Sequence, residues 1–363
     1  MKETPNTSSL QNEPMRSVHT NNFPGILSQL GISLVISTYQ AGKLIVVRAD
    51  DHRINTHFRI FPKPMGIAAS RAKIAIGCAS QIWQLNNVPA VAAKIEPTGK
   101  HDACYLPHQT HVTGNIDIHE MAWGKDDLWF INTRFSCLCT LDRNYSFVPH
   151  WRPNFITALT PEDRCHLNGL GMVNNQPKYV TALGKSDRAG GWRDHKANGG
   201  ILLDVETNEI IMSGLSMPHS PRWYGDRLWV LESGHGSLAT MDLNSGKLTT
   251  VINLPGFTRG IDFWGKLAFI GLSQVRESSV FSGIPLTKKL NERNCGVWVV
   301  NLETAQTIAF LKFEDAVQEV FAVQVLPNIR FPEIIDWDEQ LIAASYVLPD
   351  AALADVPQER LSL

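Results

Sequence analysis

HSPRWYGDRLWVLESGHGSLATMDLNSGKLTTVINL, residues 219–254, decides the fold class of this chain. Short apolar runs alternate with turn residues in this stretch: Gly-Asp, Gly-His-Gly and Asn-Ser-Gly. Apolar runs of this length, bounded by glycine, asparagine and aspartate, are typical of β-strands joined by tight turns. The stretch therefore predicts four antiparallel strands in succession.

The same pattern recurs along the chain. HEMAWGKDDLWFINTRFSCLCTLDRNYSFVPHW, residues 119–151, matches it run for run. Weaker copies keep the same order of runs and begin at Pro64, Leu167, Thr258 and Val320. The last copy is short, and we expect the apolar runs at 32–40 and 41–50 to complete its sheet. Repeated four-stranded antiparallel units form the blades of a β-propeller, so we predict an all-β propeller closed by strands from both chain ends.

Counting the innermost strands favours six blades, and seven blades remain open because residues 96–118 carry no assigned strand. Residues 1–24 are polar and lack a hydrophobic period, so we expect a flexible arm there. We interpret residues 25–350 as a single propeller domain and 351–363 as a tail that begins with a short helix.

Composition and charge argue against several partner classes. The chain has 363 residues, a formal net charge of -2 and a pI of about 6.6, without a basic tract. Binding to nucleic acid or to an anionic membrane is therefore not expected. No apolar run approaches the roughly 18 residues of a membrane span, and the N-terminus lacks the apolar core of a secretory signal. We expect a cytoplasmic protein with a small-molecule substrate; a protein partner remains open.

One repeat position carries polar groups just ahead of the predicted innermost strands. These groups are His119, His166, His219, Arg259 and Glu319. Residues at this position ring one mouth of the central channel in a propeller. The five residues align only with slips along the strands, and a slip of one residue turns a side chain to the opposite face. The sequence therefore leaves open whether all five face the channel.

Three imidazoles and one carboxylate from different blades form a ligand set for a divalent metal ion such as Fe, Zn or Mn. We predict that His119, His166, His219 and Glu319 hold such an ion. The alternative is that these histidines bond to neighbouring blades and that the channel holds water.

Charged residues on loops after strand ends are the candidate catalytic and substrate-binding groups. They are Arg134 in NTRF, Arg259 in FTRG, and Arg276 and Glu277 in GLSQVRES. The guanidinium group of arginine suits a carboxylate or phosphate. Trp192, in the insertion at 184–199, is the tryptophan that we expect to contact a ligand. We interpret His108 and His111 as loop residues.

The motifs HEMAWG, NTRFSCL, HLNGLGM, MPHSPRW, FTRGIDF, GLSQVRES, CGVWVVNL and EVFAVQVLP together resemble an uncharacterised bacterial family that is defined only as a domain of unknown function. The resemblance covers nearly the whole chain and implies a propeller without an assigned activity. More distantly, the repeats look like six-bladed propellers of the gluconolactonase, strictosidine synthase and streptogramin lyase types. That resemblance implies a fold and, for several of those proteins, a divalent cation at the channel mouth.

Two functions follow from these observations. The first is a metal-dependent enzyme that acts on a small polar or anionic substrate at the channel mouth, with lyase, hydrolase and oxygenase chemistry all open. The alternative is a propeller scaffold that binds a peptide or protein and has structural histidines.

Overall fold

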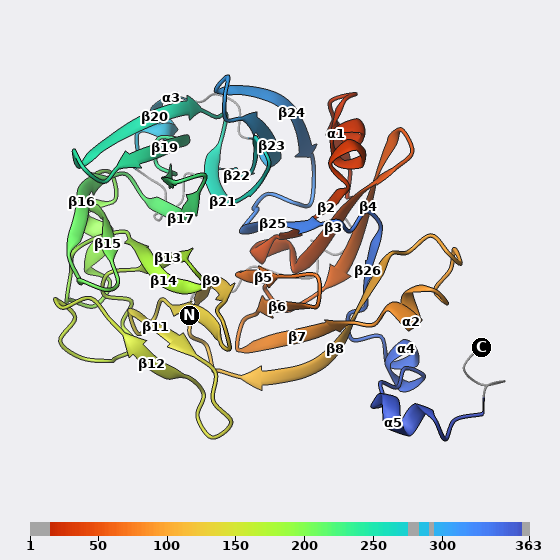
Figure 1. Ribbon diagram of the computed structural model, residues 1–363. Helices are drawn as coiled ribbons and strands as arrows, with labels where there is room; N and C mark the ends of the chain where they lie inside the picture. The colour runs from red at the N-terminus through yellow and green to blue at the C-terminus, as the bar shows by residue number, and fades with distance from the viewer. Residues whose placement is uncertain (1–14, 275–282, 290–293, 358–363) are drawn as a thin grey trace, which may run out of the picture.

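The computed structural model describes residues 15–274, 283–289 and 294–357, and in these ranges the strands form six sheets arranged in a ring (Figure 1). Every sheet contains four antiparallel strands, and two of the sheets gain a fifth strand at the outer edge. The predicted all-β propeller with six blades is confirmed, and the seven-bladed alternative is wrong.

We number the blades in chain order from the one that begins after Pro64. Blade 1 consists of β5 (Ile67–Ala69), β6 (Lys73–Gly77), β7 (Gln81–Asn87) and β8 (Ala103–Val112). Blade 2 consists of β9 (Ile118–Trp123), β10 (Leu128–Asn132), β11 (Cys137–Thr140) and β12 (Val148–Trp151). Blade 3 consists of β13 (Leu167–Val173), β14 (Gln176–Ala182), β15 (Gly200–Asp204) and β16 (Ile210–Leu215).

Blade 4 is the quoted stretch and consists of β17 (Pro218–Tyr224), β18 (Arg227–Glu232), β19 (Ser237–Asp242) and β20 (Lys247–Asn253). Blade 5 consists of β21 (Phe257–Trp264), β22 (Leu267–Ser273), β23 (Cys295–Asn301) and β24 (Gln306–Phe313). Blade 6 consists of β25 (Ala322–Pro327), β2 (Ile32–Ser37), β3 (Lys43–Asp50) and β4 (Arg53–Ile60).

The turn residues explain why the quoted stretch folds into hairpins. Gly225 and Asp226, between the first two strands of blade 4, both have a φ of 56°. Two successive residues with positive φ are typical of the type I′ turn, whose twist matches that of the flanking strands. Asn174 and Asn175 make the same kind of turn in blade 3, with φ of 51° and 61°.

Strands from both chain ends close the ring in blade 6. β25 pairs with β2 from Ile32 opposite Pro327 to Ser37 opposite Ala322, and Figure 1 shows this blue strand beside the red ones. An apolar cluster joins blades 5 and 6 across this closure and contains Leu34, Val297 and Val323. The predicted closure by the N-terminal strands is therefore confirmed.

The stretch at 96–118 contains the outermost strand of blade 1. His108 and His111 lie on β8, so their interpretation as loop residues is wrong. The end of β8 that carries them is largely exposed, and its sequence PHQTHV lacks the apolar run by which the other strands were recognised. The other half of β8, residues 103–106, is apolar and buried, and β26 pairs with part of it.

Each end of the chain adds structure outside the blades. β1 (Ser17–His19) pairs with β24, so part of the segment that the sequence predicts as a flexible arm is a β-strand. β26 (Pro332–Ile334) runs parallel to β8 at the edge of blade 1. The short helix that we expected near the C-terminus is α5 (Asp350–Leu353). The remaining helical segments are α1 (Phe23–Leu30), η1 (Tyr39–Ala41), α2 (Pro89–Ala92), η2 (Gly191–His195), α3 (Leu286–Lys289) and α4 (Glu339–Ala343).

None of the helices in the described ranges is long and apolar enough to cross a membrane.

Side-chain hydroxyls tie several blades to the next near the channel. Thr133 Oγ1 donates to the carbonyl oxygen of Leu167 (2.6 Å), and Ser233 Oγ donates to that of Thr258 (2.5 Å). Ser37 and Ser273 bond to the following blade in the same way. Neighbouring inner strands approach so closely that a Cβ at Gly66 would collide with the backbone of blade 2. This packing gives the channel mouth a rigid frame on which side chains can be held.

Candidate functional site

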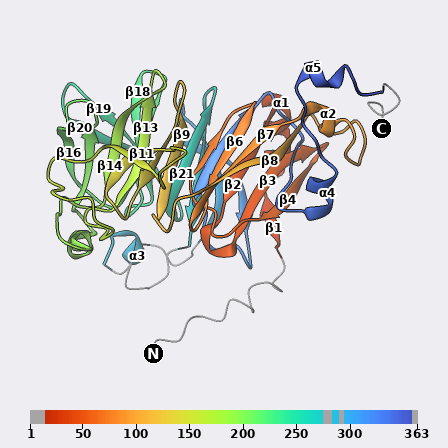
Figure 2. The same cartoon turned by 90° about the horizontal axis from the view of Figure 1, so that it is seen from below.

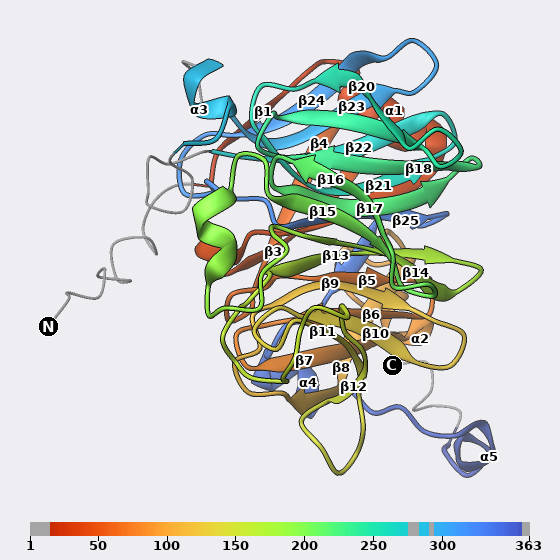
Figure 3. The same ribbon diagram turned by 90° about the vertical axis from the view of Figure 1, so that its left-hand side faces the viewer.

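A cavity of about 390 Å³ opens at one mouth of the ring, and we call it the mouth pocket. Leu286 of α3 packs in one cluster with Trp192, Met217 and Phe257 of its wall, so the pocket lies at the end of the ring where Figures 2 and 3 show α3. The residues predicted at the recurring repeat position, His119, His166, His219, Arg259 and Glu319, all line it. The rest of the lining consists of Tyr39, Asp117, Asp163, Leu183, Trp192, Arg193, Met217, Phe257 and Phe321.

β-Bulges explain how residues that align imperfectly in sequence face one cavity. The inner strands of blades 2 to 5 each carry one extra residue near their start relative to the second strand. Such a bulge changes the face of the strand to which the neighbouring side chains point. It can therefore compensate for a shift of one residue in the alignment of the repeats. In blade 2, His119 and Glu120 together oppose Ile131, and in blade 5, Arg259 and Gly260 oppose Gly271.

Positive φ angles at the starts of the inner strands also affect the direction of the side chains that line the pocket. His166 has a φ of 52°, Asp117 one of 50° and Met217 one of 47°. Residues other than glycine adopt this left-handed region at a cost in energy, and such residues cluster at functional sites.

His119 and His219 are held by the same set of contacts in two different blades. Nδ1 of His119 lies 2.9 Å from the carbonyl oxygen of Asp117 and 2.8 Å from Thr133 Oγ1. Nδ1 of His219 lies 3.0 Å from the carbonyl oxygen of Met217 and 2.9 Å from Ser233 Oγ. Each imidazole therefore bonds a carbonyl two residues back and a hydroxyl fourteen residues ahead.

His166 is held by a carboxylate instead. Its Nδ1 lies 2.8 Å from Asp163 Oδ1, while Asp163 Oδ2 accepts hydrogen bonds from Trp192 Nε1 (2.9 Å) and Arg193 Nη2 (3.0 Å). The rings of His166 and Trp192 are in contact at 4.5 Å between centroids, and those of His119 and His166 at 4.8 Å. The insertion at 184–199 thus supplies both a wall of the pocket and the groups that hold Asp163.

Burial keeps two of the imidazoles neutral. It lowers the pKa of His119 to about 3 despite the opposing effect of Asp117. Burial, together with the nearby charge of Arg259, lowers the pKa of His219 well below its ordinary value. Burial would raise the pKa of Asp163, but the charge and hydrogen bond of His166 and the bonds from Trp192 and Arg193 hold it below its usual range. The pocket therefore contains neutral imidazoles and an ionised carboxylate at neutral pH.

Arg259 brings a positive charge to the mouth pocket. Its guanidinium carbon lies 3.5 Å from the centroid of the Phe321 ring. In the part of the chain that the structure describes, the guanidinium makes no hydrogen bond or ion pair. Burial lowers the pKa of Arg259 to about 10, while Glu319 and Asp117 act in the opposite direction, so the group stays charged at neutral pH.

The other predicted site residues have different positions. Arg134 is half-buried beside the site without lining the cavity, and its Nε is buried with no hydrogen-bond partner in the described ranges. Its backbone accepts a bond from the amide of Asp163. Arg276 and Glu277 lie outside the described residues. Trp192, expected to contact a ligand, forms part of the pocket wall.

Several residues that line the mouth pocket were not among the site residues predicted from the sequence. Asp117 and Asp163 precede His119 and His166 by two and three residues, and this acidic residue before a repeat histidine is a signal that could have been recognised. Tyr39 and Phe321 come from blade 6, which the two chain ends build together, and no repeat pattern marks them.

The ligand set predicted for a metal ion is only partly assembled. Across the described residues, no three or more His, Cys, Asp or Glu side chains are grouped closely enough to hold a metal ion. His119, His166 and His219 are each held through Nδ1, and His166 and Glu319 are half-buried.

The fold and the mouth pocket define a class: six-bladed β-propellers with a small-molecule-sized cavity at one mouth of the ring. Residues 21–335 match the family model described as Domain of unknown function (DUF4915), and the chain belongs to this family. None of the curated proteins matches the chain.

The chain is also similar to solved structures at low sequence identity. It aligns with a chain of a Nidogen/Laminin complex at a TM-score of 0.54 and 9% identity, over 82% of this chain and 99% of that one. A protein of unknown function from Bacteroides caccae aligns at a TM-score of 0.51 and 9% identity, over 81% and 98% of the two chains. These likenesses show the fold alone.

A catalytically inactive virginiamycin B lyase from Staphylococcus aureus, crystallised with quinupristin, aligns at a TM-score of 0.38 and 13% identity, over 82% of this chain and 99% of that one. This score is too low to support an inference about the site.

Proposed function

We propose that the protein is an enzyme that acts on a small anionic substrate with an apolar part, bound in the mouth pocket. The observation that carries the proposal is the charged guanidinium of Arg259, which has no hydrogen-bond or ion-pair partner in the described chain and shares the cavity with three imidazoles. Glu319 and Asp117 stabilise this charge electrostatically, but the N–H donors of a partly buried guanidinium are costly to leave without acceptors. An anionic group of a ligand could accept two hydrogen bonds from the guanidinium.

The walls of the pocket suit the apolar part of such a substrate. Tyr39, Trp192, Phe257 and Phe321 surround the charged groups, and a volume of about 390 Å³ lies in the range of small-molecule sites. Aromatic walls beside polar groups are typical of pockets that orient a ligand rather than bind it by charge alone.

Calorimetric titration with matched ligand pairs tests the role of Arg259. The probes are benzoate against benzamide, indole-3-acetate against its amide, and phenyl phosphate against phenol. We expect at least one anion to bind wild-type protein more tightly than its neutral counterpart, and Arg259→Gln to lose about tenfold or more of that affinity. Arg227→Gln, at an exposed site in blade 4, is the matched control. If no anion is preferred, the proposal fails and the scaffold hypothesis gains support.

We further propose that a divalent metal ion, such as Fe, Zn or Mn, binds through His119, His166 and His219, with Glu319 as a fourth ligand. Metal-binding histidines usually bond their other ring nitrogen to a carbonyl or carboxylate, as the Nδ1 atoms do here. The low pKa of His119 and His219 also favours the proposal, because an imidazole must be neutral to bind a metal. When bound, such an ion polarises a carbonyl group or activates water.

Elemental analysis by mass spectrometry tests the metal proposal. The protein is purified without chelator or nickel resin, and a variant with His119, His166 and His219 changed to alanine is compared with one in which His52, His108 and His235 are changed. We expect about one equivalent of a transition metal in wild type and control, and loss of that metal in the pocket variant. Equal metal content in all three proteins, or none in any after incubation with Fe(II), Zn(II) and Mn(II), would contradict the metal proposal.

A further inference from the structure

The hydrogen bonds around the three pocket histidines determine which ring nitrogen carries the proton. Nδ1 of His119 has two neighbours, the carbonyl oxygen of Asp117 and the hydroxyl of Thr133. A carbonyl oxygen only accepts, and the single hydroxyl proton of Thr133 is donated to the carbonyl of Leu167. Both neighbours of Nδ1 are therefore acceptors, and Nδ1 must be the donor.

His219 follows the same rule in blade 4. Its Nδ1 bonds the carbonyl oxygen of Met217 and the hydroxyl of Ser233, and that hydroxyl donates its proton to the carbonyl of Thr258. His219 is therefore also protonated at Nδ1, and its Nε2 carries a lone pair.

His166 reaches the same state through Asp163. Oδ2 of Asp163 accepts from Trp192 Nε1 and from the guanidinium of Arg193, and Asp163 thus acts as a carboxylate acceptor on both oxygens, so Nδ1 of His166 donates to Oδ1. No group in the described ranges bonds the Nε2 of His119, His166 or His219, and none of these three atoms is sealed from solvent. Because the three rings line the mouth pocket, their Nε2 lone pairs are available to a ligand there.

We propose that Asp163 is a positioning residue that fixes His166 as the Nδ1–H tautomer, so that the pocket presents three Nε2 lone pairs to one ligand. The inference deepens the proposed function, since three such donors suit an electron-pair acceptor: a divalent cation or a polarised O–H or N–H group of the substrate. The backbone carbonyls of Asp117 and Met217 set the tautomer of His119 and His219, whereas His166 depends on one side chain.

The donors around Asp163 make Asp163→Asn a sharp test. Trp192 Nε1 and Arg193 Nη2 both donate to Oδ2 of Asp163, so the amide oxygen of an asparagine would take that place. Its NH₂ group would then face Nδ1 of His166 and would have to donate to it. We expect His166 to change to the Nε2–H tautomer, which removes its lone pair from the pocket.

The tautomer is measured directly by two-bond ¹H–¹⁵N correlation NMR on metal-free protein with ¹⁵N-labelled histidine. Spectra at about pH 8.5, above the ordinary histidine pKa near 6.5, report neutral rings. His119→Gln, His166→Gln and His219→Gln variants assign the signals. In wild type we expect all three rings to have a protonated Nδ1 and an unprotonated Nε2, and in Asp163→Asn we expect the two nitrogens of His166 to exchange character.

Asp187→Asn is the matched control, because Asp187 also lies in the insertion but bonds Thr157 and Arg164 and no histidine. It should leave all three tautomers unchanged. Wild-type His166 with a proton on Nε2, or Asp163→Asn with the wild-type tautomer, would overturn the inference. The wild-type spectrum tests the inference even if Asp163→Asn does not fold.

Titration with Co(II) and with the anion panel distinguishes the two kinds of ligand. Loss of Co(II) absorption bands in Asp163→Asn indicates a metal bound through His166, whereas loss of anion affinity without Co(II) binding in wild type indicates a substrate hydrogen bond. Because the tautomer is measured without ligand, its outcome is independent of whether the proposed substrate or metal binds. If Asp163→Asn changes the tautomer but alters neither binding reaction, the three-lone-pair site is contradicted.

Discussion

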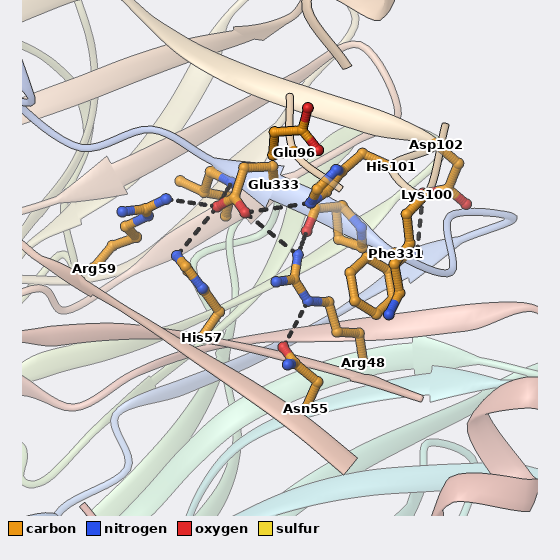
Figure 4. Close-up of polar contacts among 12 residues, drawn as sticks. Arg48, Asn55, His57, Arg59, Glu96, Lys100, His101, Asp102, Phe331 and Glu333 are labelled. Carbon is orange, nitrogen blue, oxygen red and sulfur yellow. Dashed lines mark hydrogen bonds and ion pairs between the residues drawn. The ribbon is translucent and has the colours of Figure 1, made fainter. Parts of the chain in front are cut away.

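Two groups of arginine and histidine side chains lie in this molecule, and they differ in whether the charges have partners. In the mouth pocket, the guanidinium of Arg259 has no hydrogen-bond or ion-pair partner in the described chain and opens into a cavity. The second group surrounds Glu333, which is buried with Arg48 and His101, while His57 and Arg59 are half-buried; we call it the Glu333 cluster (Figure 4). It consists of Arg48, His57, Arg59, His101 and Glu333.

The Glu333 cluster joins blades 1 and 6 beside the ring closure. Glu333 lies on β26 at the edge of blade 1, and its carboxylate contacts Arg59 at 2.8 Å and Arg48 at 3.5 Å, both from blade 6. His57 and His101 lie 3.2 Å and 3.5 Å from the same carboxylate. Burial alone would raise the pKa of Glu333, but the hydrogen bond from Arg59 and the charges of His57, Arg59 and Arg48 hold it below its usual range.

The two groups of side chains suit different roles: ligand binding at the mouth pocket and stabilisation of the fold at the Glu333 cluster. Similar residue types form a largely buried group of paired charges around Glu333 and a group that opens into a cavity at the mouth pocket, where Arg259 has no ion pair in the described chain. A buried ion pair is costly to break, whereas an unpaired cation at a cavity contributes little to stability and is free to bind. Function should therefore be sought at the mouth pocket, and stability at the Glu333 cluster.

The largest expected effect is on the Glu333 cluster. Glu333→Gln leaves the buried guanidinium of Arg48 and the half-buried guanidinium of Arg59 without their counter-charge, and we expect a loss of about 3–5 kcal/mol in the free energy of unfolding. Urea denaturation followed by circular dichroism measures it. Glu303→Gln, which removes an exposed ion pair with Lys266, is the matched control and should change stability by less than about 1 kcal/mol. Equal losses in the two variants would show that the Glu333 cluster is not a structural ion pair.

A second test uses the pH dependence of stability. Burial lowers the pKa of His119 to about 3 and that of His219 well below its ordinary value, whereas in the unfolded chain both accept a proton near pH 6.5. Below that pH the unfolded state binds more protons, so acidification destabilises the native state. Between about pH 6 and 4 we expect each histidine to lower the free energy of unfolding by up to about 1.4 kcal/mol per pH unit.

Urea titrations of metal-free protein at several pH values measure this dependence. The His119→Gln/His219→Gln variant should show a shallower slope than wild type, and His52→Gln/His108→Gln, at exposed positions, should retain the wild-type slope. An unchanged slope in the pocket variant would mean that the two imidazoles are not held neutral.

The third prediction contrasts two arginines near the channel. Arg222 binds Glu120 through Nη1 (2.9 Å) and Nη2 (3.0 Å), so Arg222→Met leaves a carboxylate unpaired and should cost about 3 kcal/mol. Arg259→Met removes a cation without such a bond, and we expect its free energy of unfolding to stay within about 1 kcal/mol of wild type. Denaturation curves of the two variants measure the free energies of unfolding. If Arg259→Met loses as much stability as Arg222→Met, Arg259 has a structural role.

Much of the fold was predictable because its signals are local. Apolar runs between turn residues identified the inner strands, and the recurring position ahead of them identified His119, His166, His219, Arg259 and Glu319 as neighbours. β8 was missed because its apolar run is only four residues long, at 103–106, and its exposed half, residues 107–112, has none. The role of Asp163 was missed because it depends on Trp192 and Arg193, which reach it from an insertion almost thirty residues away.

The sequence by itself favoured six blades and predicted the closure of the ring by both chain ends and the repeat position that carries the polar groups, because each depends on patterns within a few residues. The six sheets of the structure then excluded seven blades. Only the tertiary structure decided that these groups face one cavity, since β-bulges and positive φ angles correct the direction of each side chain. It also decided that Tyr39 and Phe321 complete the pocket, that Arg259 has no partner in the described chain and that Glu333 joins two blades. Contacts between blades bring together residues far apart in the chain, and no local pattern records them.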